Sequence, residues 1–212
     1  MGEKEKGGRS NADAGSRSVR AFIAAALPGD VAADLGRLQS RLKDFGLRMK
    51  YTEPENIHLT LRFLGDVSID SIGEIGQKIT DAAAEFARLE LSARGLGVFP
   101  AIRRARVMWA GIDGQTDLLA GLQQEVEEAV AGLGFEREKK GFTGHLTLGR
   151  FKKGCDPALL AEAIRRYGDF ASARFTVDAL HLFESTLTPG GAVCRILSSH
   201  PLKGVPNKES WQ

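Results

Sequence analysis

The chain has 212 residues, of which 42% are hydrophobic and 26% charged, the proportions of an ordinary globular protein. Its formal net charge of +2 is too small to indicate a nucleic-acid-binding protein by itself, so any basic patch has to be local. Its longest apolar run, residues 21–27, is much shorter than the roughly 20 residues that span a membrane, so we expect no membrane association.

The chain ends and the cysteines indicate the domain boundaries and the cellular compartment. Residues 1–18 mix glycine, serine and charges without the apolar segment of a secretory signal, so we expect a disordered leader there and a flexible tail at 203–212. Cys155 and Cys194 have no CxxC spacing, which argues against a disulfide framework and a zinc site and favours a cytoplasmic protein. A single domain is expected over 19–202.

Apolar periodicity predicts that strands and helices alternate along the chain. A buried strand is expected at 19–27, ended by Pro28-Gly29, and an amphipathic helix at 30–45. The other expected elements, in order, are a short strand at 47–51, a turn at 52–56, a strand at 57–64, a helix at 69–86, strands at 89–99 and 106–112, a helix at 114–133, a strand at 145–151, a helix from Asp156-Pro157 to about 167, and strands at 174–185 and 193–200 joined by 187–191.

One tetrapeptide that contains reactive side chains occurs twice, as His58-Leu59-Thr60-Leu61 and His145-Leu146-Thr147-Leu148. Each copy lies in an alternating run typical of a strand, so histidine and threonine should share one face and the leucines should face the core. The copies are 87 positions apart in similar surroundings, which indicates an internal duplication. We therefore predict an α+β fold of two lobes related by a pseudo-twofold axis, with the motifs facing each other across a central cleft.

Two histidines across a cleft suit acid–base chemistry. An unperturbed imidazole pKa of about 6.5 lets one ring donate a proton while the other accepts one. The hydroxyls of Thr60 and Thr147 can donate hydrogen bonds to the free oxygens of a phosphate held between them. Activated water can then attack phosphorus, so the chemistry needs no protein nucleophile.

The motifs and several further segments resemble the 2H phosphoesterase superfamily, and within it the RNA 2′,3′-cyclic phosphodiesterases once called 2′-5′ RNA ligases. The resemblance runs over about 19–202, in the family's order, which makes it far more specific than a short motif. The matching segments are 20–24, 54–65, 95–100, 106–111, 145–150 and 184–193.

The resemblance implies a bilobal fold with an antiparallel sheet in each lobe, helices outside and a central cleft. It also implies an enzyme that hydrolyses the 2′,3′-cyclic phosphate at an RNA end to a 2′-phosphate without a metal or other cofactor, with weak reverse 2′-5′ ligation. His58 would be the acid and His145 the base, and an arginine at position 150 would bind phosphate. We expect a monomer.

The remaining site candidates depend on which face of a strand they occupy. Arg150 lies five residues after His145, on the opposite face of an ideal strand, and needs a bulge or a strand end to reach phosphate. Arg62 shares the face of His58, either lining the cleft or standing as a solvated charge. Tyr51 is the best candidate to stack on a base.

Other side chains are open to two interpretations. Arg103, Arg104 and Arg106 are either RNA-backbone contacts or solvated loop charges. Core packing is the better interpretation for Phe22 and Trp109. His181 and His200 lie outside any motif and are expected to be structural or exposed.

The sequence departs from the family at three positions. Gly144 stands where proline is frequent, Cys194 where an aromatic residue is frequent, and Tyr51 where tryptophan is frequent. No HExxH motif or close histidine pair indicates a metal hydrolase. The alternative function, from another class, is a non-catalytic module that binds RNA ends or nucleotides.

Overall fold

The structure is a computed structural model that describes residues 17–188 and 191–204. Most of the predicted leader (1–18) and tail (203–212) lies outside the described residues, as do Pro189 and Gly190 of the predicted last connection. In the described part of the chain, no helix is long and apolar enough to cross a membrane.

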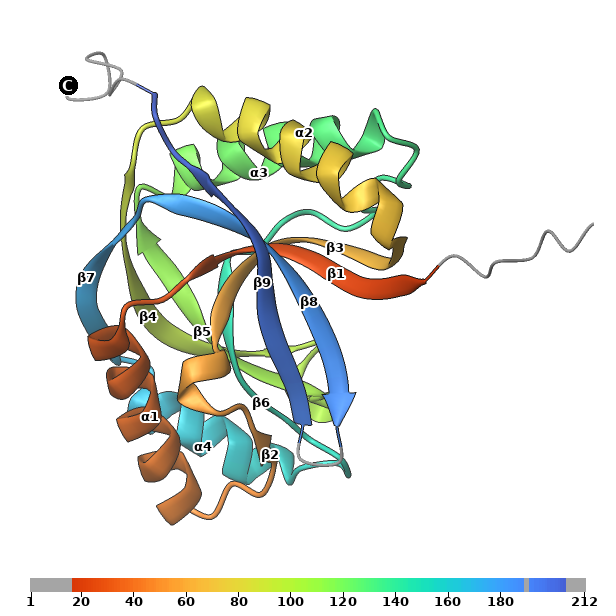
Figure 1. The fold of residues 1–212 in the computed structure, drawn as a ribbon. Helices are drawn as coiled ribbons and strands as arrows, with labels where there is room; N and C mark the ends of the chain where they lie inside the picture. Colours follow the sequence, from red (N-terminus) through yellow and green to blue (C-terminus); the bar gives the residue numbers. More distant parts are fainter. Residues whose placement is uncertain (1–16, 189–190, 205–212) are drawn as a thin grey trace, which may run out of the picture.

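Over the described residues, the strands pair antiparallel in one curled sheet, and the helices pack around it (Figure 1). The strands are β1 (Ser18–Ala26), β2 (Lys50–Tyr51), β3 (His58–Ser68), β4 (Leu89–Phe99), β5 (Val107–Gly114), β6 (His145–Arg150), β7 (Ala171–Val177), β8 (Ala179–Thr188) and β9 (Gly191–Pro201). The helices are α1 (Gly29–Asp44), α2 (Ile72–Ala84), α3 (Thr116–Ala131) and α4 (Pro157–Tyr167), with short 3-10 turns η1 (Pro54–Asn56), η2 (Ile69–Ser71) and η3 (Ile102–Arg104).

The sheet has two halves that meet at one residue pair. Its strand order is β7-β4-β5-β6-β3-β1-β8-β9, with β2 added beside β6, and only Leu59 of β3 and Leu146 of β6 pair across the middle. We call β1, β3, β8 and β9 with α2 and α3 the first lobe, and β2, β4, β5, β6 and β7 with α1 and α4 the second lobe. The predicted α+β fold with two duplicated lobes is confirmed.

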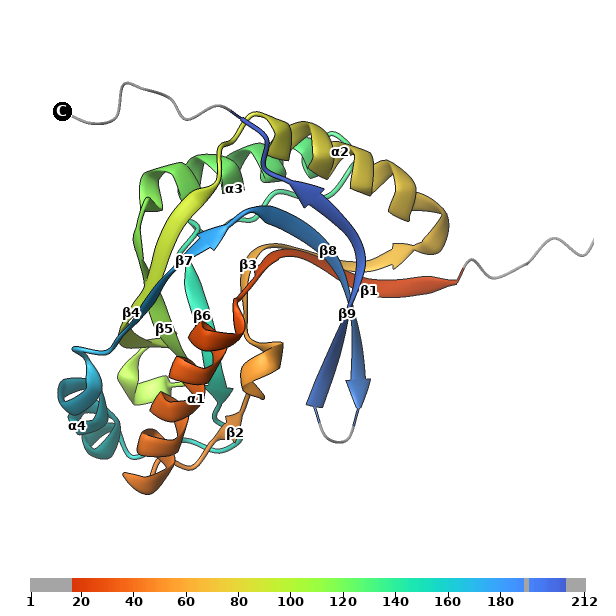
Figure 2. The ribbon, with the colours of Figure 1, turned by 60° about the vertical axis from the view of Figure 1, so that its left-hand side comes forward.

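The helices form two pairs, one for each lobe. α2 and α3 pack on each other and over β3, β8 and β9, while α1 lies against β7 and α4 against β4. Figure 2 shows the α2–α3 pair above the curled sheet and the α1–α4 pair below it. On α1 the buried stripe is Val31, Leu35, Leu38 and Leu42, at the predicted three- and four-residue steps. Asp156 caps α4 by accepting a hydrogen bond from the N–H of Ala158, also as predicted.

One predicted element is wrong. The expected single strand at 174–185 is two strands, since β7 ends at Val177 and β8 begins at Ala179. β7 pairs with β4 in the second lobe and β8 pairs with β1 in the first lobe, so the chain changes lobe at Asp178. An unbroken apolar pattern hides this crossing because both strands bury the same kind of residue.

A β-bulge lies at the last residue of each motif. β1 and β3 pair Ala24 with Thr60 and then Ile23 with Arg62, which leaves Leu61 as an extra residue. β5 and β6 likewise leave Leu148 unpaired between two successive ladder pairs. A bulge of this kind shifts the alternation of side chains by one residue. The residues that directly follow each bulge therefore occupy the face opposite to the one that simple counting gives.

The first bulge turns Arg62 away from the cleft and toward the helices. Its side chain is 6% exposed, and its Nε lies 2.9 Å from Oε2 of Glu127 on α3. Its Nη1 lies 3.0 Å from Oε1 of Glu138, and its Nη2 donates to the main-chain oxygen of Glu136. Both sequence interpretations of Arg62, a cleft residue and a solvated charge, are wrong. It is the buried cation of an ion-pair network that ties the segment after α3 to β3.

Replacing Arg62 by methionine should lower the free energy of unfolding by about 3–5 kcal/mol, because Glu127 is left buried without its cation. Urea denaturation of the purified protein measures this. Arg137→Met is the matched control, since its ion pair with Glu128 is exposed and should contribute little. Equal, small effects of the two substitutions would contradict a stabilising network at Arg62.

Candidate active site

The motif histidines and threonines lie on one face of the sheet, at the junction of the lobes. Because the central leucines of the two motifs pair in antiparallel strands, the register places His58 across from Thr147 and Thr60 across from His145. The paired leucines point to the opposite face and are fully buried. The two motifs therefore supply matching halves of one pseudo-symmetric site.

Both imidazoles are oriented by a main-chain carbonyl. Nδ1 of His58 lies 2.9 Å from the oxygen of Asn56, and Nδ1 of His145 lies 2.7 Å from the oxygen of Thr143. A carbonyl oxygen only accepts hydrogen bonds, so Nδ1 carries the hydrogen in both rings. Nε2 is then the nitrogen left for proton transfer in each histidine.

The ring of His58 packs against Phe22 and Phe183, which we call the aromatic wall. Its ring stacks on Phe22 with centroids 4.6 Å apart and lies 5.8 Å from Phe183, and these two phenylalanines stack on each other at 5.1 Å. The pKa of His58 is lowered to about 4, chiefly by burial and to a smaller extent by the nearby His145, while the hydrogen bond to Asn56 raises it. His58 is therefore neutral at physiological pH in the free protein.

His145 meets aromatic rings in a different geometry. The ring of Phe99 meets it edge-on at 5.0 Å, and Trp109 lies 6.3 Å away. Gly97 pairs with Trp109 across β4 and β5, and a Cβ at this glycine would collide with the indole. The tryptophan can lie flat here because position 97 has no side chain.

Arg150 reaches the same face as His145 because of the second bulge. It pairs with Val107 on one side and Lys50 on the other, and its side chain is exposed. The equivalent position in the first motif, five residues after His58, is Phe63, which is 53% exposed. The two halves of the site thus differ in charge, with an arginine in one and a phenylalanine in the other.

The sequence model of the LigT-like phosphoesterases matches twice, over residues 26–109 and 111–194. The chain belongs to the LigT-like phosphoesterase family. The two matched segments correspond to the duplication, and each contains one histidine motif. The family is part of the 2H phosphoesterase superfamily, so the resemblance seen in the sequence is confirmed.

Named relatives and solved structures cover most of this phosphoesterase. The RNA 2′,3′-cyclic phosphodiesterase of Aeropyrum pernix is 37% identical over 77% of this chain and 92% of the relative. That of Methanothermobacter thermautotrophicus is 34% identical over 82% and 94%. A crystal structure of a Thermus thermophilus protein matches with a TM-score of 0.72 at 26% identity over 87% and 98%. Escherichia coli LigT complexed with 3′-AMP shares the fold, with a TM-score of 0.70 at 19% identity over 88% and 99%.

Tyr51 is not brought to the site face of this LigT-like phosphoesterase. It pairs with Gly149, the buried residue before Arg150, and it packs among the core residues. Its hydroxyl donates to the main-chain oxygen of Leu47 at 2.9 Å, and burial raises its pKa to about 12. The residue beside it, Lys50, is the one that shares the face of Arg150.

A cavity of about 370 Å³ lies beside His58. Its apolar lining includes Phe183, Cys194 and Ile196, and η1 contributes Glu55 and Asn56. Sequence reasoning missed Phe183 as a neighbour of the motif, because only the pairing of β8 with β1 brings it there. Phe22, expected to be a packing residue, is 3% exposed and does pack, as the support of the His58 ring.

The other two histidines have structural contacts. His200 is 5% exposed and bonds Oγ1 of Thr80 and Oγ of Ser198, both at 2.8 Å. Nδ1 of His181 lies 2.9 Å from Oγ of Ser199. Among the described residues, no three histidine, cysteine or acidic side chains gather as metal ligands would.

The aromatic wall can be tested by titrating His58 with NMR. We expect its ring to stay neutral at pH 5.5, with a pKa near 4. Phe183→Ala should raise that pKa toward 6.5, because water then reaches the charged form. Phe99→Ala, which opens the ring contact of His145 instead, is the matched control and should leave His58 almost unchanged. A wild-type pKa near 6.5 would refute the role given to burial.

Proposed function

We propose that this phosphoesterase hydrolyses the 2′,3′-cyclic phosphate at an RNA end to a 2′-phosphomonoester, without a metal ion or other cofactor. The observation that carries the proposal is the pair of imidazoles on one sheet face, each with Nδ1 fixed and Nε2 left for proton transfer. The names of the Aeropyrum and Methanothermobacter relatives support the substrate class.

In the proposed reaction, Nε2 of His145 takes a proton from water as the water oxygen attacks phosphorus. The bond from phosphorus to the 3′ oxygen breaks, and Nε2 of His58 delivers a proton to that oxygen. The products are a 2′-phosphate and a 3′-hydroxyl. Thr60 and Thr147 donate hydrogen bonds to the two free phosphate oxygens, and Arg150 balances the negative charge that grows on them.

The acid role of His58 depends on the substrate. Its ring is neutral in the free protein because burial disfavours its charged form. A phosphate anion beside it favours that charged form, so substrate binding should load His58 with the proton that it later delivers. The acid role that the family resemblance implies for His58 is therefore compatible with its neutral state in the free protein. His145 remains the base in this assignment.

Replacing either motif histidine by alanine should lower turnover by roughly 10²–10⁴-fold, the usual contribution of a general acid or base. The assay follows 2′-monophosphate formation from a 2′,3′-cyclic nucleotide in the presence of EDTA. Circular dichroism checks that His58→Ala and His145→Ala fold. Full activity of either variant would refute the two-histidine mechanism, and no wild-type product between pH 5 and 8 would favour the non-catalytic RNA-end module.

Arg150→Gln should lower kcat/KM by roughly 10- to 150-fold, because a charge-assisted hydrogen bond contributes about 1.5–3 kcal/mol. Arg150→Lys keeps the charge but loses the planar fork that matches a phosphate. It should fall between the wild type and the glutamine variant. Steady-state kinetics on a cyclic mononucleotide gives kcat/KM for all three proteins. A kcat/KM of Arg150→Gln equal to that of the wild type would place this arginine outside the phosphate site.

The proposal extends to the setting of the enzyme. We place it in the cytoplasm as a monomer, working as one domain over 19–202 between a leader and a tail, and its two free thiols suit a reducing compartment. Microscopic reversibility allows a weak reverse reaction that joins a 2′,3′-cyclic end and a 5′-hydroxyl end in a 2′-5′ linkage.

A further inference from the structure

The end of the second lobe beyond Arg150 carries a concentration of unpaired positive charge. All of its lysines and arginines are exposed, and none forms an ion pair with another described residue. Because the whole chain has a formal net charge of only +2, this is a local excess. We call this group the cationic track; its members are Lys50, Arg103, Arg104, Arg106, Arg150, Lys152 and Lys153.

Backbone pairing holds the cationic track next to the phosphate site. Lys50 pairs with Arg150 across β2 and β6, so their side chains share a face one strand spacing apart, about 4.8 Å. The N–H of Phe151 donates to the main-chain oxygen of Arg106 at 2.9 Å, which fixes the segment after η3 beside the end of β6. The track therefore begins at the residue proposed to bind the reacting phosphate and continues outward from it.

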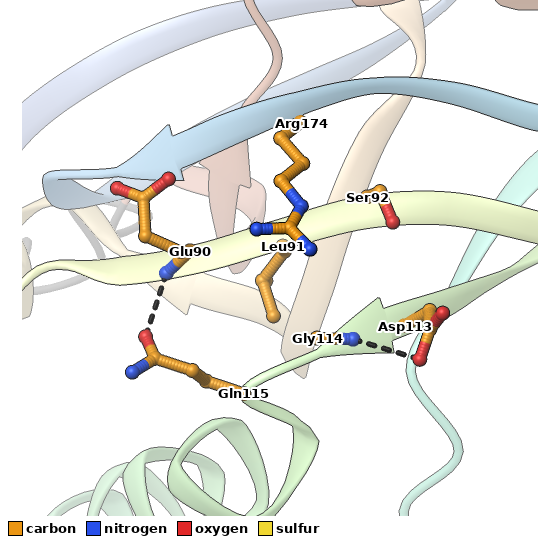
Figure 3. A pocket seen from close by; sticks show the side chains of 7 residues that line it. All are labelled: Glu90, Leu91, Ser92, Asp113, Gly114, Gln115 and Arg174. Atoms are coloured by element: carbon orange, nitrogen blue, oxygen red, sulfur yellow. Dashed lines mark hydrogen bonds between the residues drawn. The ribbon is translucent and has the colours of Figure 1, made fainter.

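The other end of the same strands differs in charge balance. A cavity of about 320 Å³ lies there, and Arg174 extends over it between the carboxylates of Glu90 and Asp113 (Figure 3). Arg94 pairs with Asp113 at 3.0 Å. Two arginines and two carboxylates cancel, so this end attracts a polyanion weakly. Electrostatic attraction therefore favours a path along the cationic track for a single-stranded nucleic acid that extends out of the phosphate site.

We propose that the cationic track binds backbone phosphates of the RNA upstream of the cyclic end, which makes oligonucleotides, rather than mononucleotides, the preferred substrates. The inference rests on the proposed function of the site and adds the substrate class to it. Phosphate contacts of this kind release counterions, so binding weakens as salt rises, with a slope of about 0.7 per contact for single strands. A mononucleotide has no upstream phosphate and gains nothing from the track.

The test variant is Lys50→Gln/Arg103→Gln/Arg104→Gln, which removes three exposed charges and leaves both histidines, both threonines and Arg150 in place. Its kcat/KM on an octanucleotide with a 2′,3′-cyclic end should fall roughly tenfold or more in low salt. Its kcat/KM on a cyclic mononucleotide should stay within about twofold of the wild type. The slope of log affinity against log salt for the octanucleotide should decrease by about 2.

Arg94→Gln is the matched control, because Arg94 is an exposed arginine of the same sheet but is paired with Asp113. It should leave octanucleotide turnover unchanged. A loss in Arg94→Gln equal to that in the triple variant, an unchanged triple variant, or a parallel fall on the mononucleotide would each overturn the proposal.

Fluorescence anisotropy with an octanucleotide ending in a 2′-phosphate measures the same contacts without turnover. The triple variant should bind this probe roughly tenfold more weakly than the wild type, and equal binding would overturn the track. If the wild type bound the probe in this way but hydrolysed neither substrate, the proposed function would fail while the track remained supported.

Discussion

One backbone pair, Leu59 with Leu146, determines how the two halves of the cleft face each other. Since it is the single ladder pair between β3 and β6, it decides which residue of one motif stands across from which residue of the other. A slip of one residue would turn the histidine of one motif toward the core. Both leucines are fully buried in a core cluster that includes residues of all four helices, so such a slip would expose apolar surface in both lobes.

The bulges at the ends of the motifs are the second constraint, because they decide which charges lie on the face of the motif histidines. Without the bulge at Leu148, Arg150 would point to the buried face of the sheet, where even a Cβ at Gly149 would crowd Met49 and the main-chain oxygen of Lys50. Without the bulge at Leu61, Arg62 would face the cleft and Glu127 would be buried without its cation. The same backbone device thus brings one arginine to the site and removes another from it.

Much of this arrangement could be predicted from the sequence, because it depends on periodicity and on a repeated motif. The strand faces of the motifs, the duplication and the Asp156 cap all follow from local pattern. The faces of Arg62, Arg150 and Tyr51 could not be predicted, since a bulge is a property of two paired strands and leaves no clear mark in either one. The break at Asp178 was hidden for a similar reason: it depends on which lobe each strand joins.

The two motifs are nearly identical, so the lowered pKa of His58 has to come from outside its motif. The turns before them are not the source, because each supplies the same carbonyl contact to Nδ1. The neighbouring strands are the source. β1 and β8 place Phe22 and Phe183 on His58, whereas β5 has Val107 at the position that matches Phe22.

The residue five places after each histidine adds to the difference, with Phe63 in one half and Arg150 in the other. At this position the first half is therefore apolar, and the second half carries a positive charge. In the proposed reaction, the phosphate that Arg150 binds in the second half also contacts His58 in the first half. In that reaction, substrate binding favours the charged form of His58, which burial disfavours in the free protein.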